Sequence, residues 1–133
     1  DEIQAAVIRV KLKRIEAFNA GRRRAADLYR NYIKSTDIRL PVESEGCMHV
    51  YHQFSIRSPH RDRIVECLRK RDIASAIYYP VPLHLQEAFP EADRRGLGTA
   101  EEIAAEILSL PMFPEISEGE VREVSETIND GCP

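Results

Sequence analysis

The stretch that decides the fold is His49–Tyr79, which reads HVYHQFSIR, then SPHRDRIVECLRKRD, then IASAIYY. In residues 49–57, β-branched and aromatic residues alternate with other side chains, which predicts a strand. Residues 58–72 predict a helix, because Ser58 suits the N-terminal cap and an apolar face follows it. Residues 73–79 predict a second strand. The stretch therefore predicts a strand–helix–strand unit.

Residues 1–34 predict one long helix, since apolar side chains recur at three- and four-residue steps. Asp1 and Gln4 have the spacing of a capping box, and Gly21 marks the position where we expect a bend. Other apolar residues lie off the main stripe, so we expect another domain or subunit to cover them: Leu12, Ile15 and Tyr29. Because the chain opens inside this pattern and without a methionine, we expect it to be the back part of a longer protein.

The last third of the chain adds two helices. Residues 99–107 predict a helix, and a short strand or extended piece is expected from Ser109 to Met112. The final helix is predicted to begin at Ser117, which has capping-box spacing to Glu120, and to stop at Gly131. The expected fold is an α/β (α+β) two-layer sandwich. It has a sheet of about three strands, with the long N-terminal helix and further helices on one side.

Length and composition limit the class of protein. The 133 residues suit one domain, so we assign residues 1–133 to a single unit that can bury a core with its 43% hydrophobic residues. The net charge of −3 argues against a nucleic-acid partner, which usually requires a strongly basic face. No apolar run approaches the roughly 20 residues of a membrane span, and we expect a cytoplasmic protein without membrane contact. The cysteines form no CxxC pair, and we expect free thiols: Cys47, Cys67 and Cys132.

Three groups of polar residues could indicate a phosphate contact, a metal site or catalytic carboxylates, but the spacing of these residues favours none of the three. Arg22–Arg24 could contact a phosphate, but a solvated helix face is the favoured interpretation. His49 and His52 point to opposite faces of the predicted strand, so they cannot close on one metal ion. Several glutamates with helical spacing are expected on solvated helix faces: Glu101, Glu102 and Glu106. We therefore predict no catalytic residue and no metal ligand in this chain.

The segment 78–86, YYPVPLHLQ, is the strongest candidate for a binding site. Its two prolines push the residues before them into extended conformations, so the segment is stiff. Tyr78, Tyr79 and His84 present hydrogen-bonding tips on flat rings, which suit a sugar or a nucleotide. From the chemistry alone a rigid packed turn is the favoured explanation, and the wall of a binding site is the other.

Four blocks of the sequence, taken in order, resemble the C-terminal part of the DegT/DnrJ/EryC1/StrS aminotransferases. The blocks are DEIQAAVIRVKLKRIEAFNAGRRRAADLYR, HVYHQFSIR, YYPVPLHLQEAF and AAEILSLPMFPEISEGEV. The resemblance implies the small domain of a fold-type-I enzyme. Such enzymes use pyridoxal phosphate to move an amino group from glutamate or glutamine to a nucleotide-linked keto sugar, usually as homodimers.

The resemblance also implies that the large domain, with the lysine that forms the Schiff base, is absent from this chain. The lysines present fall at helical surface positions, and none matches the family's catalytic lysine: Lys11, Lys13, Lys34 and Lys70. A lysine that captures a carbonyl also needs a lowered pKa, which no sequence context here suggests. We expect no cofactor bound to this fragment and no transaminase activity from it alone.

In the family, the proline-rich block lines the sugar-nucleotide pocket and usually begins His-Tyr-Pro. Tyr78 stands where that histidine would be, while Tyr79, both prolines and His84 keep the pattern. The resemblance thus implies Tyr78, Tyr79 and His84 as substrate contacts in the intact enzyme, with Gln4 ranked below them. A structural role for His84 stays open, and so does the nature of the Tyr78 contact, because tyrosine reaches further than histidine.

A regulatory or binding module without catalysis is the alternative function. In that case the same fold holds a small effector or a protein partner. The sequence ahead of Asp1 distinguishes the two hypotheses, because a lysine-bearing domain there favours the enzyme.

Overall fold

Two short antiparallel strands form the centre of the structure, a computed structural model that describes residues 1–89 and 95–130. Strand β1 (Phe54–Arg57) pairs with β2 (Ile107–Leu110), and Phe54 lies opposite Leu110. The helices are α1 (Glu2–Leu12), α2 (Ile15–Tyr32), α3 (Arg61–Lys70), α4 (Gly98–Glu106) and α5 (Glu118–Asp130), with a 3₁₀ turn at Leu83–Leu85.

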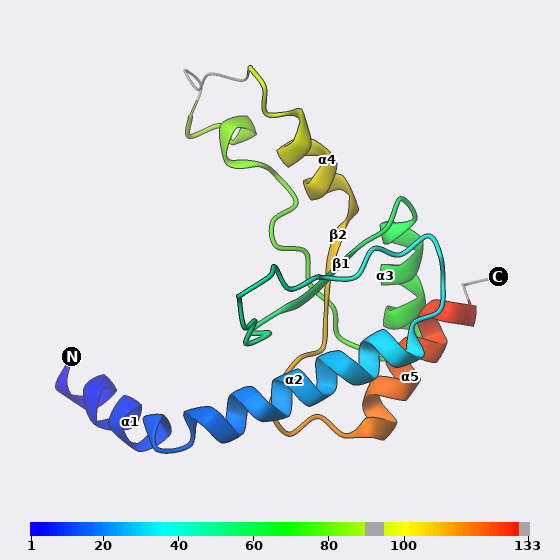
Figure 1. Cartoon of the computed structure of the whole chain (residues 1–133). Coiled ribbons are helices and arrows are strands. Elements are labelled where there is room, and N and C mark those ends of the chain that lie inside the picture. Colours follow the sequence, from blue (N-terminus) through cyan, green and yellow to red (C-terminus); the bar gives the residue numbers. More distant parts are fainter. Residues whose placement is uncertain (90–94, 131–133) are drawn as a thin grey trace.

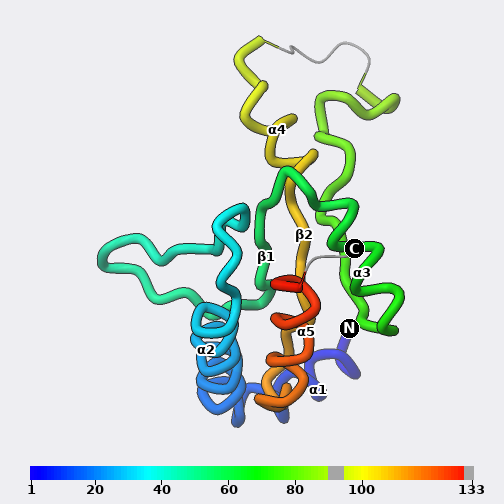
Figure 2. Tube along the Cα trace, turned by 90° about the vertical axis from the view of Figure 1, so that its right-hand side faces the viewer, coloured from blue at the N-terminus to red at the C-terminus, as the bar shows by residue number. Residues whose placement is uncertain are grey.

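The core lies between one face of this sheet and the helices. Phe54 and Ile56 of β1, with Leu108 and Leu110 of β2, point toward α2, α3 and α5 and are buried. Helices α2 and α5 lie side by side over the sheet (Figure 2). The chain also extends beyond this core, since α1 continues away from α2 at one end and α4 lies at the other (Figure 1). Helices α2, α3 and α5 on one side of a small sheet confirm the predicted α/β sandwich, whereas the sheet of the described residues has two strands and not the expected three or so.

The predicted helix over residues 1–34 is two helices, and the break is at Lys13–Arg14 rather than at Gly21. Arg14 leaves helical geometry with φ −118° and ψ 7°. Gly21 lies within α2, where a Cβ atom would come within 2.4 Å of the carbonyl oxygen of Pro114. The glycine therefore permits a close approach between α2 and the segment before α5, and it does not bend the helix.

Of the predicted caps in the described residues, Asp1 and Ser117 are confirmed and Ser58 is wrong, because α3 begins only at Arg61 and Ser58 Oγ accepts from the N–H of His60 instead. The Asp1 carboxylate accepts a hydrogen bond from the backbone N–H of Ile3 at 3.0 Å. The Gln4 side chain makes no return bond to a described residue, so the capping box at Asp1 is only half formed.

At α5 the box is complete: Ser117 Oγ accepts from the N–H of Glu120 at 3.2 Å, and the Glu120 carboxylate accepts from the N–H of Ser117 at 2.8 Å. The Ser117 hydroxyl also donates to the Glu120 carboxylate at 2.7 Å, and this bond, followed by that from the Ser117 N–H, lowers the pKa of Glu120. The predicted stop at Gly131 lies outside the described residues.

The strand predicted over residues 49–57 is shorter than expected and begins at Phe54. Tyr51 has φ 47°, in the left-handed region that a tyrosine in a strand does not adopt. The ring of Tyr51 is nevertheless buried against the core. Burial of this ring outweighs the local preference of these residues for a strand. The segment before Phe54 is therefore irregular.

The strand predicted over residues 73–79 is reduced to one bridge, in which Ala76 and Ser109 exchange two backbone hydrogen bonds of 3.1 and 2.8 Å. In this register Ala74 would pair with Pro111, which has no N–H to donate. A second bridge, between Arg39 and Arg57, lies on the outer edge of β1. The sheet therefore has two strands with a bridge at each edge, and β2 lies between β1 and residues 73–79.

The prediction of free cysteines is wrong at Cys67, which is disulfide-bonded. Cys47 is free and exposed, and Cys132 lies outside the described residues. Within the described residues, no helix combines the length and the apolar composition that crossing a bilayer requires.

Candidate functional site

The proline-rich segment runs from the bridge at Ala76 to the 3₁₀ turn at Leu83–Leu85 and then approaches α4. The turn is closed by hydrogen bonds from Leu85 N–H to the carbonyl of Pro82 (2.9 Å) and from Gln86 N–H to that of Leu83 (3.2 Å). The peptide bond between Tyr78 and Tyr79 is cis. The segment thus has a defined path beside α4, as its prolines predict.

His84 fastens this segment to α4. Its side chain is only 9% exposed, and Nε2 lies 3.0 Å from a carboxylate oxygen of Glu101. The ring also lines the cleft between the segment and α4. The sequence leaves open whether His84 contacts the substrate or stabilises the fold. Its contact with Glu101 supports the role in stabilising the fold.

Tyr78 and Tyr79 are the exposed part of the site, with 44% and 72% of their surface accessible. Their rings meet edge to face with centroids 5.8 Å apart. Neither hydroxyl has a hydrogen-bond partner in the part of the chain that the structure describes. Both rings are therefore available to a ligand.

These tyrosines line a cleft of about 670 Å³ between the proline-rich segment and α4. Its walls are largely apolar, with Pro82 and Leu83 on one side and Ile103 on the other. A cleft of this size with a few polar groups lies in the range of small-molecule sites, roughly 300–1,000 Å³. The flat rings and apolar walls suit an aromatic or sugar face.

Tyr78 also lines a second cleft, of about 330 Å³, on its other side. This cleft is formed by residues before β1, after α3 and along β2, including His52, Ser75 and Ser109. The Ser109 hydroxyl is 2.8 Å from that of Ser55 on the paired strand. Tyr78 is thus the residue that the two clefts share.

Arg57 of β1 sets the position of α4. Its guanidinium donates to Glu106 at 3.0 Å through Nε and to Glu102 at 2.8 Å through Nη2. With Glu101 bound to His84, each of these α4 glutamates has a specific partner. Glu101 and Glu102 are solvent-exposed as predicted, whereas Glu106 is half-buried. The spacing of four residues between Glu102 and Glu106, which places them on one helix face, was the signal available in the sequence.

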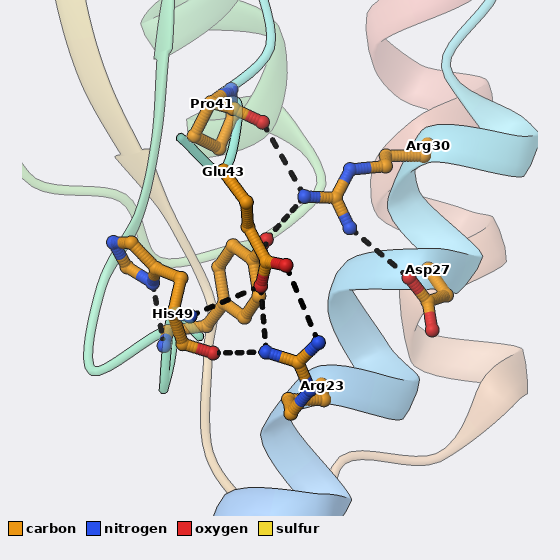
Figure 3. Close-up of polar contacts among 7 residues, drawn as sticks. Arg23, Asp27, Arg30, Pro41, Glu43 and His49 are labelled. Atoms are coloured by element: carbon orange, nitrogen blue, oxygen red, sulfur yellow. Dashed lines mark hydrogen bonds and ion pairs between the residues drawn. The ribbon is translucent and has the colours of Figure 1, made fainter. Parts of the chain in front are cut away.

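A second polar cluster holds the loop before β1 against α2 (Figure 3). The Glu43 carboxylate accepts hydrogen bonds from Arg23 at 2.6 Å, from the backbone N–H of His49 at 3.1 Å and from the Tyr51 hydroxyl at 3.1 Å. The hydrogen bond from Arg23 is the main reason why the pKa of Glu43 is lowered to about 2. Arg23 also donates to the carbonyl of His49 at 2.6 Å. This cluster is satisfied internally, which indicates a structural role.

Of the arginines predicted to form a solvated face of α2, Arg24 is exposed, while Arg22 and Arg23 are half-buried. Arg24 donates to the carbonyl of Ile116 at 2.9 Å, and Arg30 lies over the ring of Tyr51 with its Cζ 5.0 Å from the centroid. Arg30 also donates to the Tyr51 hydroxyl and pairs with Asp27 at 3.0 Å. These side chains fasten loops to α2.

The residues present do not fit pyridoxal phosphate as a covalently held group. Every lysine of the chain is exposed on a helix or at a helix end, away from both clefts, and Lys70 pairs with Glu66 at 3.2 Å. A lysine that forms an imine needs burial or a cationic neighbour to lower its pKa. As for metals, the described residues contain no group of three His, Cys, Asp or Glu side chains placed to hold an ion.

Comparison with known proteins gives matches along nearly the whole chain. A sequence model described as the DegT/DnrJ/EryC1/StrS aminotransferase family matches residues 1–129. A UDP-N-acetyl-3-dehydro-alpha-D-glucosamine 3-aminotransferase of Acidithiobacillus ferrooxidans is 41% identical over 128 residues, which cover 96% of this chain and 35% of that protein. A "pleiotropic regulatory protein" of Geobacillus stearothermophilus is 39% identical over 133 residues, covering 96% of this chain and 36% of the relative.

A solved structure is similar in shape as well as in sequence. The crystal structure of DesV from S. venezuelae in complex with a ketimine intermediate superposes with a TM-score of 0.91 at 32% identity. The match covers 98% of this chain and 36% of DesV. The chain thus spans about a third of the length of the proteins it matches.

Proposed function

Because the chain belongs to the DegT/DnrJ/EryC1/StrS aminotransferase family, we propose that it is the C-terminal small domain of a sugar aminotransferase. The intact enzyme uses pyridoxal phosphate to transfer an amino group from glutamate or glutamine to a nucleotide-linked keto sugar. The observation that carries this proposal is the 41% identity to an aminotransferase that acts on a UDP-linked sugar, over 96% of this chain.

In this proposal the chain binds substrate and does not hold the cofactor. Pyridoxal phosphate carries the amino group when it is bound, and the lysine that holds it belongs to the rest of the polypeptide. Tyr78 and Tyr79 contact the sugar nucleotide with their exposed rings, which the large cleft beside α4 presents. His84 holds the segment on α4 through Glu101 and adds one wall of the cleft.

We also propose that the intact enzyme is a homodimer. The apolar face of α1 supports an interface in this region, because its large side chains are exposed: Ile3, Val7, Ile8, Val10 and Leu12. None of the residues of α1 is buried within the chain. Such a face normally contacts another domain or subunit.

A binding experiment tests the substrate role. The chain should bind a UDP- or dTDP-linked sugar in isothermal titration calorimetry, and Tyr79→Ala should weaken binding about twofold to tenfold, since stacking on one aromatic ring contributes roughly 0.5–1.5 kcal/mol. Phe113→Ala is the control, because Phe113 is also an exposed aromatic residue but lies outside both clefts. Equal affinities of wild type and Tyr79→Ala would contradict the assignment.

An absorbance experiment tests whether a lysine of this chain binds pyridoxal phosphate covalently. Added pyridoxal phosphate should give no stable imine band with this chain, and borohydride should label no particular lysine. Stable labelling of one lysine would show that the chain itself captures the cofactor and would overturn the proposal.

A regulatory module is the second candidate, and the relative named as a pleiotropic regulatory protein favours it. Reading the gene ahead of Asp1 decides between the two. A domain there that carries the Schiff-base lysine supports the enzyme, whereas a reading frame without such a domain supports the regulator.

A further inference from the structure

The smaller cleft beside Tyr78 is lined by polar side chains from three separate parts of the chain. His52 and Gln53 come from the irregular segment before β1, Ser75 from the segment after α3, and Ser109 from β2. Its volume of about 330 Å³ is at the lower end of the range for small-molecule sites, roughly 300–1,000 Å³. The chain thus brings together polar groups that the sequence separates by as many as 57 positions (52 to 109).

The backbone before β1 explains how two consecutive residues line one cleft. In a regular strand His52 and Gln53 would point to opposite faces of the sheet. The left-handed backbone of Tyr51, with φ 47°, ends regular strand geometry just ahead of them, and β1 begins only at Phe54. Both residues therefore border the same cleft.

The side chains around this cleft have hydrogen-bonding capacity that the fold does not use. In the described residues, the side chains of His52, Gln53, Ser75 and Tyr78 have no hydrogen-bond partner. The contrast with His49 is direct, because its Nδ1 accepts from the N–H of Tyr51 at 2.8 Å. Unused donors and acceptors that converge on a concave surface are typical of a ligand site.

The chemistry of the lining selects the ligand class. Among the described residues that border the cleft, none is an arginine, lysine, aspartate or glutamate. Phosphates and carboxylates are usually bound by arginine, lysine or a helix N-terminus, so this cleft does not suit an anion. An imidazole, an amide and hydroxyls beside a tyrosine ring suit the hydroxyl groups of a sugar ring.

We propose that this cleft is the sugar-ring subsite, with His52 and Gln53 as the residues that recognise the hydroxyl groups of the sugar. Tyr78 lines both clefts, so a single ligand can place its sugar here and its nucleoside against Tyr79 and α4. The inference rests on the proposed function, since it divides one nucleotide-sugar ligand between the two clefts.

The test is a titration of the isotope-labelled chain with two probes: UDP-N-acetylglucosamine and UDP. We expect UDP-N-acetylglucosamine to shift the side-chain NH₂ resonances of Gln53 and the ring resonances of His52, and UDP to shift Tyr79 but neither of these. His52→Ala and Gln53→Ala should each weaken binding of the sugar nucleotide about fivefold, the equivalent of one hydrogen bond, and leave UDP binding unchanged. His60→Ala and Asn31→Ala are matched controls, because both side chains lie outside the two clefts.

The possible results separate the inference from the function on which it rests. If the sugar nucleotide shifts Tyr79 but not His52 or Gln53, or if the two variants bind it as tightly as wild type, the subsite is wrong and the proposed function stands. If neither UDP nor the sugar nucleotide shifts any residue of either cleft, both are overturned. Sugar-dependent shifts at Gln53 that disappear in His52→Ala support the subsite.

Discussion

The close approach of α2 to the segment before α5 predicts an unusual effect of one glycine substitution. In Gly21→Ala the new methyl group would lie 2.4 Å from the carbonyl oxygen of Pro114 and 3.1 Å from its carbonyl carbon. Ordinary contact begins near 3.4 Å, so α2 and the segment must separate by about 1 Å at this point. The groups that would have to move are backbone atoms, which cannot swing aside as a side chain can.

The sign of the effect follows from two opposing terms. Alanine in place of glycine within a helix is worth about 1 kcal/mol in favour of folding. Overpacking against a rigid neighbour costs about 1–3 kcal/mol. The displacement also strains the nearby hydrogen bond from Tyr29 to the carbonyl of Pro111, which measures 2.8 Å. We therefore expect a net loss of about 1–2 kcal/mol in the free energy of unfolding.

Gly119→Ala in α5 is the matched control. Its new methyl group would meet only Ser117 Oγ, at 3.9 Å, so we expect this variant to gain about 0.5–1 kcal/mol. Urea unfolding of both variants, followed by circular dichroism at 222 nm, measures the difference. Because the helix preference of alanine is common to both, their difference of about 1.5–3 kcal/mol reports the clash. Equal stability of the two variants would refute the reasoning.

Three further predictions follow from the polar contacts. The Glu43 carboxylate has a pKa of about 2 when folded, below its ordinary value of about 4.5. The contribution of the ionised Glu43 carboxylate to the free energy of unfolding is therefore complete above pH 4.5 and is lost as the pH falls toward 2. In urea titrations, Glu43→Gln should lose less stability than wild type over this pH range. Arg57→Ala should lower the stability of the fold and speed hydrogen exchange in α4, because both ion pairs that fasten this helix to β1 are lost. Ser117→Ala removes the cap of α5 and should cost about 1 kcal/mol, measured as a fall of roughly 4 °C in Tm.

Each of these predictions has a result that contradicts it. Parallel pH profiles for wild type and Glu43→Gln between pH 2 and 4.5 would show that the cluster around Glu43 does not depend on its charge, and Glu45→Gln serves as the neighbouring control. Unchanged exchange rates in α4 of Arg57→Ala would mean that the helix is held by other contacts. An unchanged Tm for Ser117→Ala would remove the capping box as a source of stability.

The signals that the sequence carried reliably were local. The capping box at Ser117 and Glu120 involves residues three positions apart, and the structure has both of its hydrogen bonds. The helix over residues 99–107 was predicted within one residue of α4, because its apolar period and its end are also local features. The blocks of family-like sequence led to the family for a similar reason, since they are contiguous and need no knowledge of contacts.

The signals that failed depended on partners far along the chain. Nothing near Gly21 indicates that Pro114 lies against it, so the glycine looked like a bend instead of a contact point. The alternating residues 49–57 favoured a longer strand than β1, but burial of the Tyr51 ring required a left-handed backbone there. Residues 73–79 also favoured a strand by local pattern. In the fold they lie beside β2, and Pro111 stands where the next backbone hydrogen bond of the ladder would form, so only the bridge at Ala76 is made.

By itself, the sequence determined which segments of this protein form helices, where α5 is capped, and to which family the chain belongs. These properties depend on periodicity, on hydrogen bonds within one turn and on runs of residue types, all of which are written along the chain. Only the tertiary structure decided that Tyr78 borders two clefts and that His52 joins Gln53 and Ser75 around one of them. The physical reason is that these neighbours are chosen by packing between distant segments, where burial outweighs local preference.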